Sequence, residues 1–93
     1  MDSMAIGIIF NGPSLTEAKY RQVSERVAPG NQPPSGMLYH AAGPSANGFY
    51  VFEVWESREA AQEFFDTTLR AELENAQINV QPVFFDVVNT MKA

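Results

Sequence analysis

The sequence predicts an α+β fold in which two helices alternate with four strands in the order β-α-β-β-α-β. Four runs rich in apolar residues have the length of strands, at residues 4–10, 37–42, 49–56 and 82–88. Two longer segments, at residues 14–27 and 58–75, instead repeat apolar residues at helical spacing. Two split β-α-β units in this order form a ferredoxin-like sandwich, with a four-stranded antiparallel sheet and both helices on one face. A chain of 93 residues is the size of a single domain, which we expect to cover residues 1–93.

The ends of the first helix are marked by capping and loop residues. Ser14 and Glu17 have the spacing of a capping box, although Thr16 is an alternative N-cap. The segment after the helix, residues 28–36, contains three prolines and two glycines. It lacks the Lys and the Ser or Thr of a phosphate-binding loop, so we interpret it as an irregular connection.

The dipeptide Asn47-Gly48 predicts a hairpin, because both residues tolerate a positive φ. If Gly43 faces Gly48 across the hairpin, then His40 faces Val51. A slip of one residue would move His40 to the other face of the sheet.

The stretch FYVFEVWES, residues 49–57, places Glu53 among aromatic and β-branched residues. A carboxylate in such a strand needs water, a partner or a functional purpose. The predicted register makes His40 its diagonal neighbour on one face, within side-chain reach. Phe49 and Trp55 share that face by alternation. The other face takes Met37, Tyr39, Tyr50, Phe52 and Val54.

Both faces of the predicted sheet are mainly apolar, as the alternating residues of the first and last strands show. The two helices cover only one face, and a large uncovered apolar face usually marks an interface. We therefore expect a homodimer whose sheets pack face to face, the alternative being a monomer with an apolar surface.

Composition narrows the possible partners. Six basic residues against eleven acidic ones give a net charge of −5, without a basic cluster that would suit nucleic acid or an anionic membrane.

The sequence has no cysteine and one histidine, which together make a poor transition-metal site, so no metal and no cofactor are expected. No apolar run is long enough to span a membrane and no signal peptide is evident, so we expect a cytoplasmic protein.

The segments VWESREAAQEFF, residues 54–65, and LYHAAGPSANGFYVFEVW, residues 38–55, resemble a known family. They look like the strand-to-helix junction and the hairpin of antibiotic-biosynthesis-monooxygenase-like members of the dimeric α+β barrel superfamily. In oxygenases of this superfamily an Asn after the first strand and a Trp at the end of the third line the pocket, and the resemblance assigns these positions to Asn11 and Trp55. Heme-binding members supply an axial His from the second helix. The second predicted helix, residues 58–75, contains no His, so the resemblance does not extend to heme.

The sequence therefore proposes a candidate site. His40 and Glu53 are the candidate catalytic residues, since a carboxylate beside an imidazole fixes its tautomer and suits acid–base chemistry. The candidate ligand-binding residues are Asn11, Trp55, Phe49 and Val51. Each polar member also has a structural alternative: a hydrogen-bonded histidine, a contact of the carboxylate at the dimer seam, an Asn in a turn, and a packed Trp. We expect a protein that binds a small aromatic molecule in an apolar pocket, the alternative being a cofactor-independent monooxygenase acting on an aromatic or polyketide-like substrate.

Overall fold

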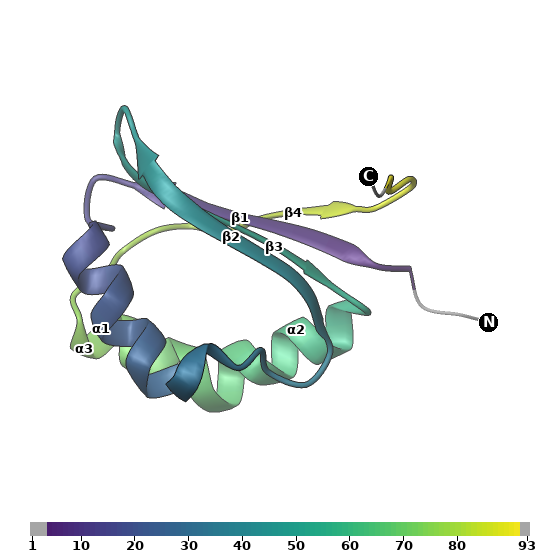
Figure 1. Cartoon of the computed structure of the whole chain (residues 1–93), viewed down its shortest axis with the longest axis horizontal. Coiled ribbons are helices and arrows are strands. Elements are labelled where there is room, and N and C mark those ends of the chain that lie inside the picture. The colour runs from purple at the N-terminus through teal and green to yellow at the C-terminus, as the bar shows by residue number, and fades with distance from the viewer. Residues whose placement is uncertain (1–3, 92–93) are drawn as a thin grey trace.

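Four strands form one antiparallel sheet in the order β2-β3-β1-β4 (Figure 1). The computed structural model describes residues 4–91. The strands are β1 Ile6–Gly12, β2 Met37–Ser45, β3 Gly48–Trp55 and β4 Val83–Asp86. This arrangement, with the helices between the first and second and the third and fourth strands, confirms the predicted ferredoxin-like fold.

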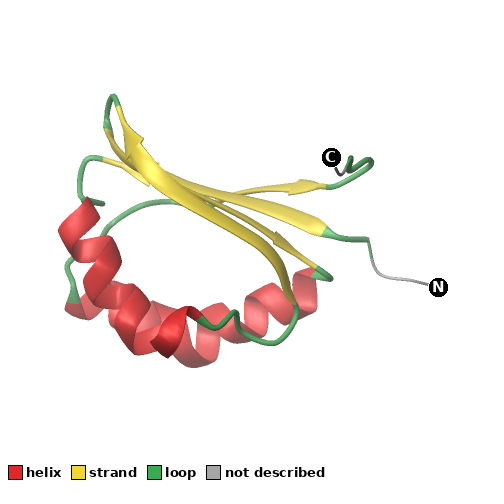
Figure 2. Ribbon diagram, in the orientation of Figure 1, coloured by secondary structure: helices red, strands yellow, loops and turns green. Residues whose placement is uncertain are grey.

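The helices all lie on one side of the sheet (Figure 2). The first is α1, Glu17–Val27, which is followed by a short 3₁₀ turn, η1, Pro29–Asn31. The second predicted helix is continuous along the chain but consists of α2, Arg58–Phe64, a π-helical turn η2, Phe65–Leu69, and α3, Arg70–Asn75. Within residues 4–91, no helix is both long and apolar enough to cross a membrane.

Side-chain caps fix where the two main helices begin. Thr16, and not Ser14, is the N-cap of α1, since its hydroxyl accepts a hydrogen bond of 3.2 Å from the Lys19 backbone N–H. The Ser14 hydroxyl instead accepts from the Asn79 backbone N–H at 2.8 Å, which ties the start of α1 to the segment before β4. Ser57 caps α2, accepting from the Ala60 N–H at 3.1 Å.

The β2–β3 hairpin is tighter than the sequence suggested. Ser45 pairs with Gly48, so that His40 lies directly opposite Glu53 and not diagonal to it. The predicted pairing of Gly43 with Gly48 is therefore wrong by two positions. A shift of two residues leaves every side chain on its predicted face, because side chains alternate with a period of two.

A β-bulge at Leu38 changes the face of one residue. Met37 pairs with Trp55 and Tyr39 pairs with Val54, which leaves Leu38 without an opposite partner. Met37 therefore lies on the same face as Trp55 and packs against the buried core. The predicted placement of Met37 with the outer residues is corrected by this one extra residue.

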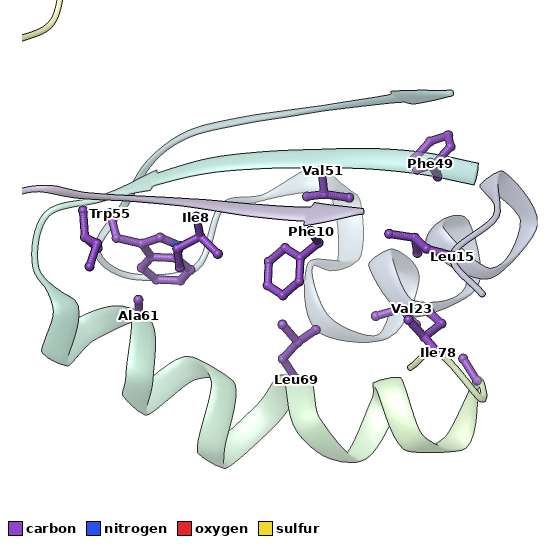
Figure 3. Close-up of a cluster of buried hydrophobic side chains, with 12 residues drawn as sticks. Ile8, Phe10, Leu15, Val23, Phe49, Val51, Trp55, Ala61, Leu69 and Ile78 are labelled. Atoms are coloured by element: carbon purple, nitrogen blue, oxygen red, sulfur yellow. The ribbon is translucent and has the colours of Figure 1, made fainter. Parts of the chain in front are cut away.

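The core lies between the sheet and the helices (Figure 3). The inner face of the sheet contributes Ile6, Ile8, Phe10, Phe49, Val51 and Trp55. The helices and the segments beside them contribute Leu15, Val23, Ala61, Leu69, Ala76 and Ile78. Burial of these side chains is the main force that holds the helices against the sheet.

The outer face of the sheet has no helix over it (Figure 1). Four of its large side chains are at least 40% exposed: Tyr39, Tyr50, Val83 and Phe85. The Phe85 ring occupies the space above Gly7 that an added Cβ would fill, and it stacks on Phe52 at 6.4 Å between ring centroids. The outer face is thus an organised apolar surface, as the alternation in the sequence predicted.

Candidate functional site

Glu53 is the one charged residue buried in the core described by the structure, with 6% of its surface exposed. Both carboxylate oxygens have partners. The Trp55 indole N–H donates to Oε1 at 2.9 Å, and His40 Nδ1 lies 3.2 Å from Oε2. These two contacts supply the hydrogen bonds that a buried carboxylate requires.

The polar contacts continue from His40 to helix α1. The Tyr20 hydroxyl lies 2.6 Å from His40 Nε2, and the two rings stack with centroids 5.8 Å apart. Together Tyr20, His40, Glu53 and Trp55 form a continuous hydrogen-bonded series, called the polar chain below. It joins α1 to the edge strand β2 and then to β3.

Because Glu53 can only accept hydrogen bonds, it determines which atom donates in each hydrogen bond of the polar chain. A carboxylate can only accept, so the neutral imidazole places its proton on Nδ1 and donates to Glu53. The lone pair on Nε2 is then free to accept from the Tyr20 hydroxyl. The result is an imidazole nitrogen that can accept a proton, held in orientation by a carboxylate that is itself fixed by Trp55.

A cavity of about 270 Å³ lies between the sheet, α1 and the second helical segment. Its wall is mainly apolar, with contributions from Phe10, Val23, Val51, Leu69 and Ile78, whose side chains point into the space between sheet and helices (Figure 3). The loop after α1 closes part of the wall with residues 31–34. Tyr20, His40 and Glu53 line the same cavity, so the polar chain supplies its titratable groups.

A second cavity of about 110 Å³ lies beside the first. Trp55 lines this smaller cavity, together with Ile8, Phe65 and Phe84. Four residues border both spaces: Phe10, Glu53, Phe64 and Leu69. Glu53 therefore lies at the junction of the two cavities.

The structure brings together some of the predicted site residues and separates others. His40, Val51 and Glu53 all line the larger cavity. Phe49 is buried on the same face, but its ring packs on Tyr20 at 5.1 Å between centroids and is not part of the cavity wall. Its contribution is to hold Tyr20 in place.

Asn11 lies away from the larger cavity. It pairs with Tyr50 in the sheet, on the face opposite to Phe10, and its Oδ1 accepts a hydrogen bond from the Ser45 hydroxyl at 2.9 Å. Alternation along β1 explains this position, since Phe10 points inward and the next residue points outward. The pocket role that the resemblance implied for Asn11 has no support in this geometry.

Tyr20 is the residue that the sequence did not single out. It belongs to the apolar repeat at residues 14–27, which predicted a helix and no polar contact. The loop at residues 31–34 was likewise interpreted as a plain connection. Only the contact between α1 and β2, which depends on tertiary structure, reveals that Tyr20 completes the polar chain.

The residues that line the larger cavity limit the kinds of ligand that it can bind. None of its described lining residues is Lys or Arg. Within residues 4–91, no group of three or more His, Cys, Asp or Glu is placed to hold a metal ion. The site therefore favours an apolar molecule with one or two hydrogen-bonding groups.

Comparison with solved structures supports the fold. The chain superposes on SnoaB, a cofactor-independent oxygenase from Streptomyces nogalater, with a TM-score of 0.64 and 14% identity, over 98% of this chain and 100% of that chain. A protein from Chloroflexus aurantiacus J-10-fl, provisionally named an antibiotic biosynthesis monooxygenase, gives a TM-score of 0.64 and 12% identity, over 95% and 97% of the two chains. PA3566 from Pseudomonas aeruginosa gives a TM-score of 0.65 and 19% identity, over 96% and 99%.

The chain has the fold of the antibiotic-biosynthesis-monooxygenase-like proteins. No protein-family model matches the sequence, and no curated protein sequence matches it. At these low identities the similarity shows the fold alone, and the site has to be interpreted from its own residues.

The direction of the polar chain gives a test that uses the single histidine of the sequence. In the native protein, we expect the neutral imidazole of His40 to carry its proton on Nδ1. In Glu53→Gln the side-chain amide can keep its oxygen on Trp55 and turn its NH₂ toward His40, so the imidazole proton should move to Nε2. Nitrogen-15 NMR of histidine-labelled protein, under conditions in which the ring is neutral, distinguishes the two tautomers. An unchanged tautomer in Glu53→Gln would contradict the assigned direction.

Proposed function

We propose that this protein binds a small aromatic molecule, uncharged or weakly acidic, in the larger cavity and against His40. The observation that carries the proposal is an apolar cavity whose wall presents one imidazole nitrogen oriented by a buried carboxylate. Such a combination of apolar surface and few convergent polar groups is typical of small-molecule sites.

The two kinds of wall residue have separate tasks in this proposal. Apolar surface supplies most of the affinity, at about 25 cal/mol for each Å² removed from water, before the cost of ordering the ligand. His40 supplies direction, because its Nε2 accepts a hydrogen bond from a ligand hydroxyl. A phosphate or multiply charged acid would find no cationic partner among the described wall residues.

The proposal predicts a preference for phenols over their methyl ethers, tested with 1-naphthol and 1-methoxynaphthalene. The phenol can donate to His40 and the ether cannot, so the native protein should bind the phenol more tightly. In His40→Ala the ratio of the two dissociation constants should fall to about one, because only apolar contacts remain. Isothermal titration calorimetry measures both ligands, and Gln22→Ala, on the exposed side of α1, is the control. Retention of the phenol preference in His40→Ala, or binding of 1-naphthyl phosphate alone, would exclude the proposed site.

A second candidate function is cofactor-independent oxygenation of the bound aromatic molecule. The polar chain supports it, since Glu53 orients the His40 imidazole as proton removal would require, and so does the shared fold with SnoaB, a cofactor-independent oxygenase. Removal of a proton from an activated CH₂ group, as in an anthrone, leaves a carbanion that dioxygen can oxidise. The balanced reaction converts CH₂ and O₂ to C=O and H₂O, so that one oxygen atom enters the product and the other leaves as water.

This candidate predicts that the protein accelerates conversion of anthrone to anthraquinone above the spontaneous rate. An oxygen electrode should report one O₂ consumed for each anthraquinone formed. His40→Ala should lose most of the acceleration, since a positioned base contributes about 10²-fold or more. Binding of anthrone with no acceleration would leave a binding protein and would rule out the enzyme.

We further propose that the apolar outer face of the sheet packs against the same face of a second copy. The face is continuous across the four strands and has no cover within residues 4–91, which supports a self-complementary interface. A homodimer of this kind leaves the cavity on the helical side of each sheet.

The dimer proposal predicts twice the chain mass in sedimentation equilibrium at micromolar concentration. Phe52→Arg places a charge on the outer face and should shift the protein to a monomer, since an unpaired charge is costly in an apolar interface. Gln22→Arg introduces the same charge on the exposed side of α1 and should leave the mass unchanged. A native protein that sediments as a monomer would refute the interface.

A further inference from the structure

We propose that Tyr20 is an internal competitor of the ligand, whose phenol occupies the hydrogen-bonding position that a ligand hydroxyl takes on His40. This inference rests on the function proposed above and specifies which aromatic molecules the site accepts. A ligand that donates to His40 must displace the Tyr20 hydroxyl, and only a stronger hydrogen-bond donor does so efficiently. The ligand class is therefore an aromatic molecule with an acidic phenol or enol.

The geometry places Tyr20 at the reactive nitrogen of the site. Its hydroxyl is 2.6 Å from His40 Nε2, and both side chains line the larger cavity. The Tyr20 ring packs against two other rings, with centroids 5.8 Å from His40 and 5.1 Å from Phe49. A phenol is thus already bound to the imidazole in a defined orientation.

Competition follows from the number of lone pairs on the imidazole. With Nδ1 donating to Glu53, the neutral ring has one acceptor site, on Nε2. The hydroxyl of Tyr20 and the hydroxyl of a ligand cannot both donate to that site. Binding of a phenol therefore replaces one hydrogen bond by another, whereas binding of an ether uses the apolar wall alone.

This exchange makes Tyr20 a specificity-determining residue. A phenol that is no more acidic than a tyrosine side chain gains little from His40, since the hydrogen bond it makes equals the one it breaks. A more acidic hydroxyl makes a stronger hydrogen bond and gains from the exchange. Tyr20 would thus deny weak donors a net gain from His40 while it keeps Nε2 satisfied in the empty site.

The test compares native protein, Tyr20→Phe, His40→Ala and the double variant by calorimetry. The ligands are 1-naphthol, the more acidic 4-chloro-1-naphthol, which keeps its hydroxyl proton at neutral pH, and 1-methoxynaphthalene. Tyr20→Phe frees Nε2 and should tighten 1-naphthol about fivefold, the equivalent of about 1 kcal/mol, with at least as large a gain for the chloronaphthol, which breaks the same Tyr20 hydrogen bond, and no change for the ether. In the His40→Ala background the Tyr20→Phe change should have no effect on phenols.

A spectroscopic readout keeps the test independent of affinity. In Tyr20→Phe, the His40 Nε2 nitrogen-15 signal should move toward the value of an imidazole nitrogen without a donor, and addition of 1-naphthol should return it. Weaker or unchanged 1-naphthol binding in Tyr20→Phe, with binding to the native protein intact, would overturn the competitor role and leave the proposed function standing. If none of the three ligands binds any of the proteins, both the competitor role and the proposed function fail.

Discussion

The burial of the Glu53 carboxylate is the constraint on which the site depends. A charge that is 6% exposed inside an apolar core has to be satisfied by donors, and the core offers two, from Trp55 and His40. The first comes from the same strand, two residues along on the same face. The second requires β2 to place His40 directly opposite Glu53, so the hairpin register and the polar chain depend on each other. Tyr20 then satisfies the far nitrogen of the imidazole and connects α1 to the edge of the sheet.

The same sheet separates two surfaces of different chemical character. Its inner face combines the apolar core with a single line of polar groups, and the cavities lie along that line. The π-helical turn Phe65–Leu69 lies beside this region, and Leu69 borders both cavities. π-turns often occur at functional sites, because they displace the side chains that follow from the regular α-helical positions. The outer face carries the Asn11–Ser45 hydrogen bond, but its large exposed side chains are mainly apolar, which favours packing over ligand binding.

Most of the fold could be predicted from the sequence because it depends on local periodicity. Helical and strand repeats gave the order of elements, and alternation placed His40, Glu53, Phe49 and Trp55 on one face. The details that could not be predicted from the sequence depend on non-local contacts. The hairpin is two positions tighter than an Asn-Gly turn suggested, and the bulge at Leu38 turned Met37 inward. Tyr20 lies 20 residues from His40 in the chain, so its spacing within α1 held no sign of the contact. Asn11 was assigned by resemblance, and the alternation of β1 places it on the other face.

Binding and turnover would use one geometry in this protein. Trp55 and Glu53 are buried and fix the orientation of the imidazole, whereas the His40 side chain is 32% exposed on the edge strand. A proton accepted by Nε2 therefore has a route to solvent, and the positive charge it creates is stabilised by the carboxylate at 3.2 Å. A ligand whose hydroxyl only donates a hydrogen bond would remain bound unchanged. A ligand whose conjugate carbanion reacts with dioxygen would be consumed at the same site. On the proposed function, the difference between a binding protein and an oxygenase would thus lie in the acidity and electron richness of the molecule that displaces Tyr20.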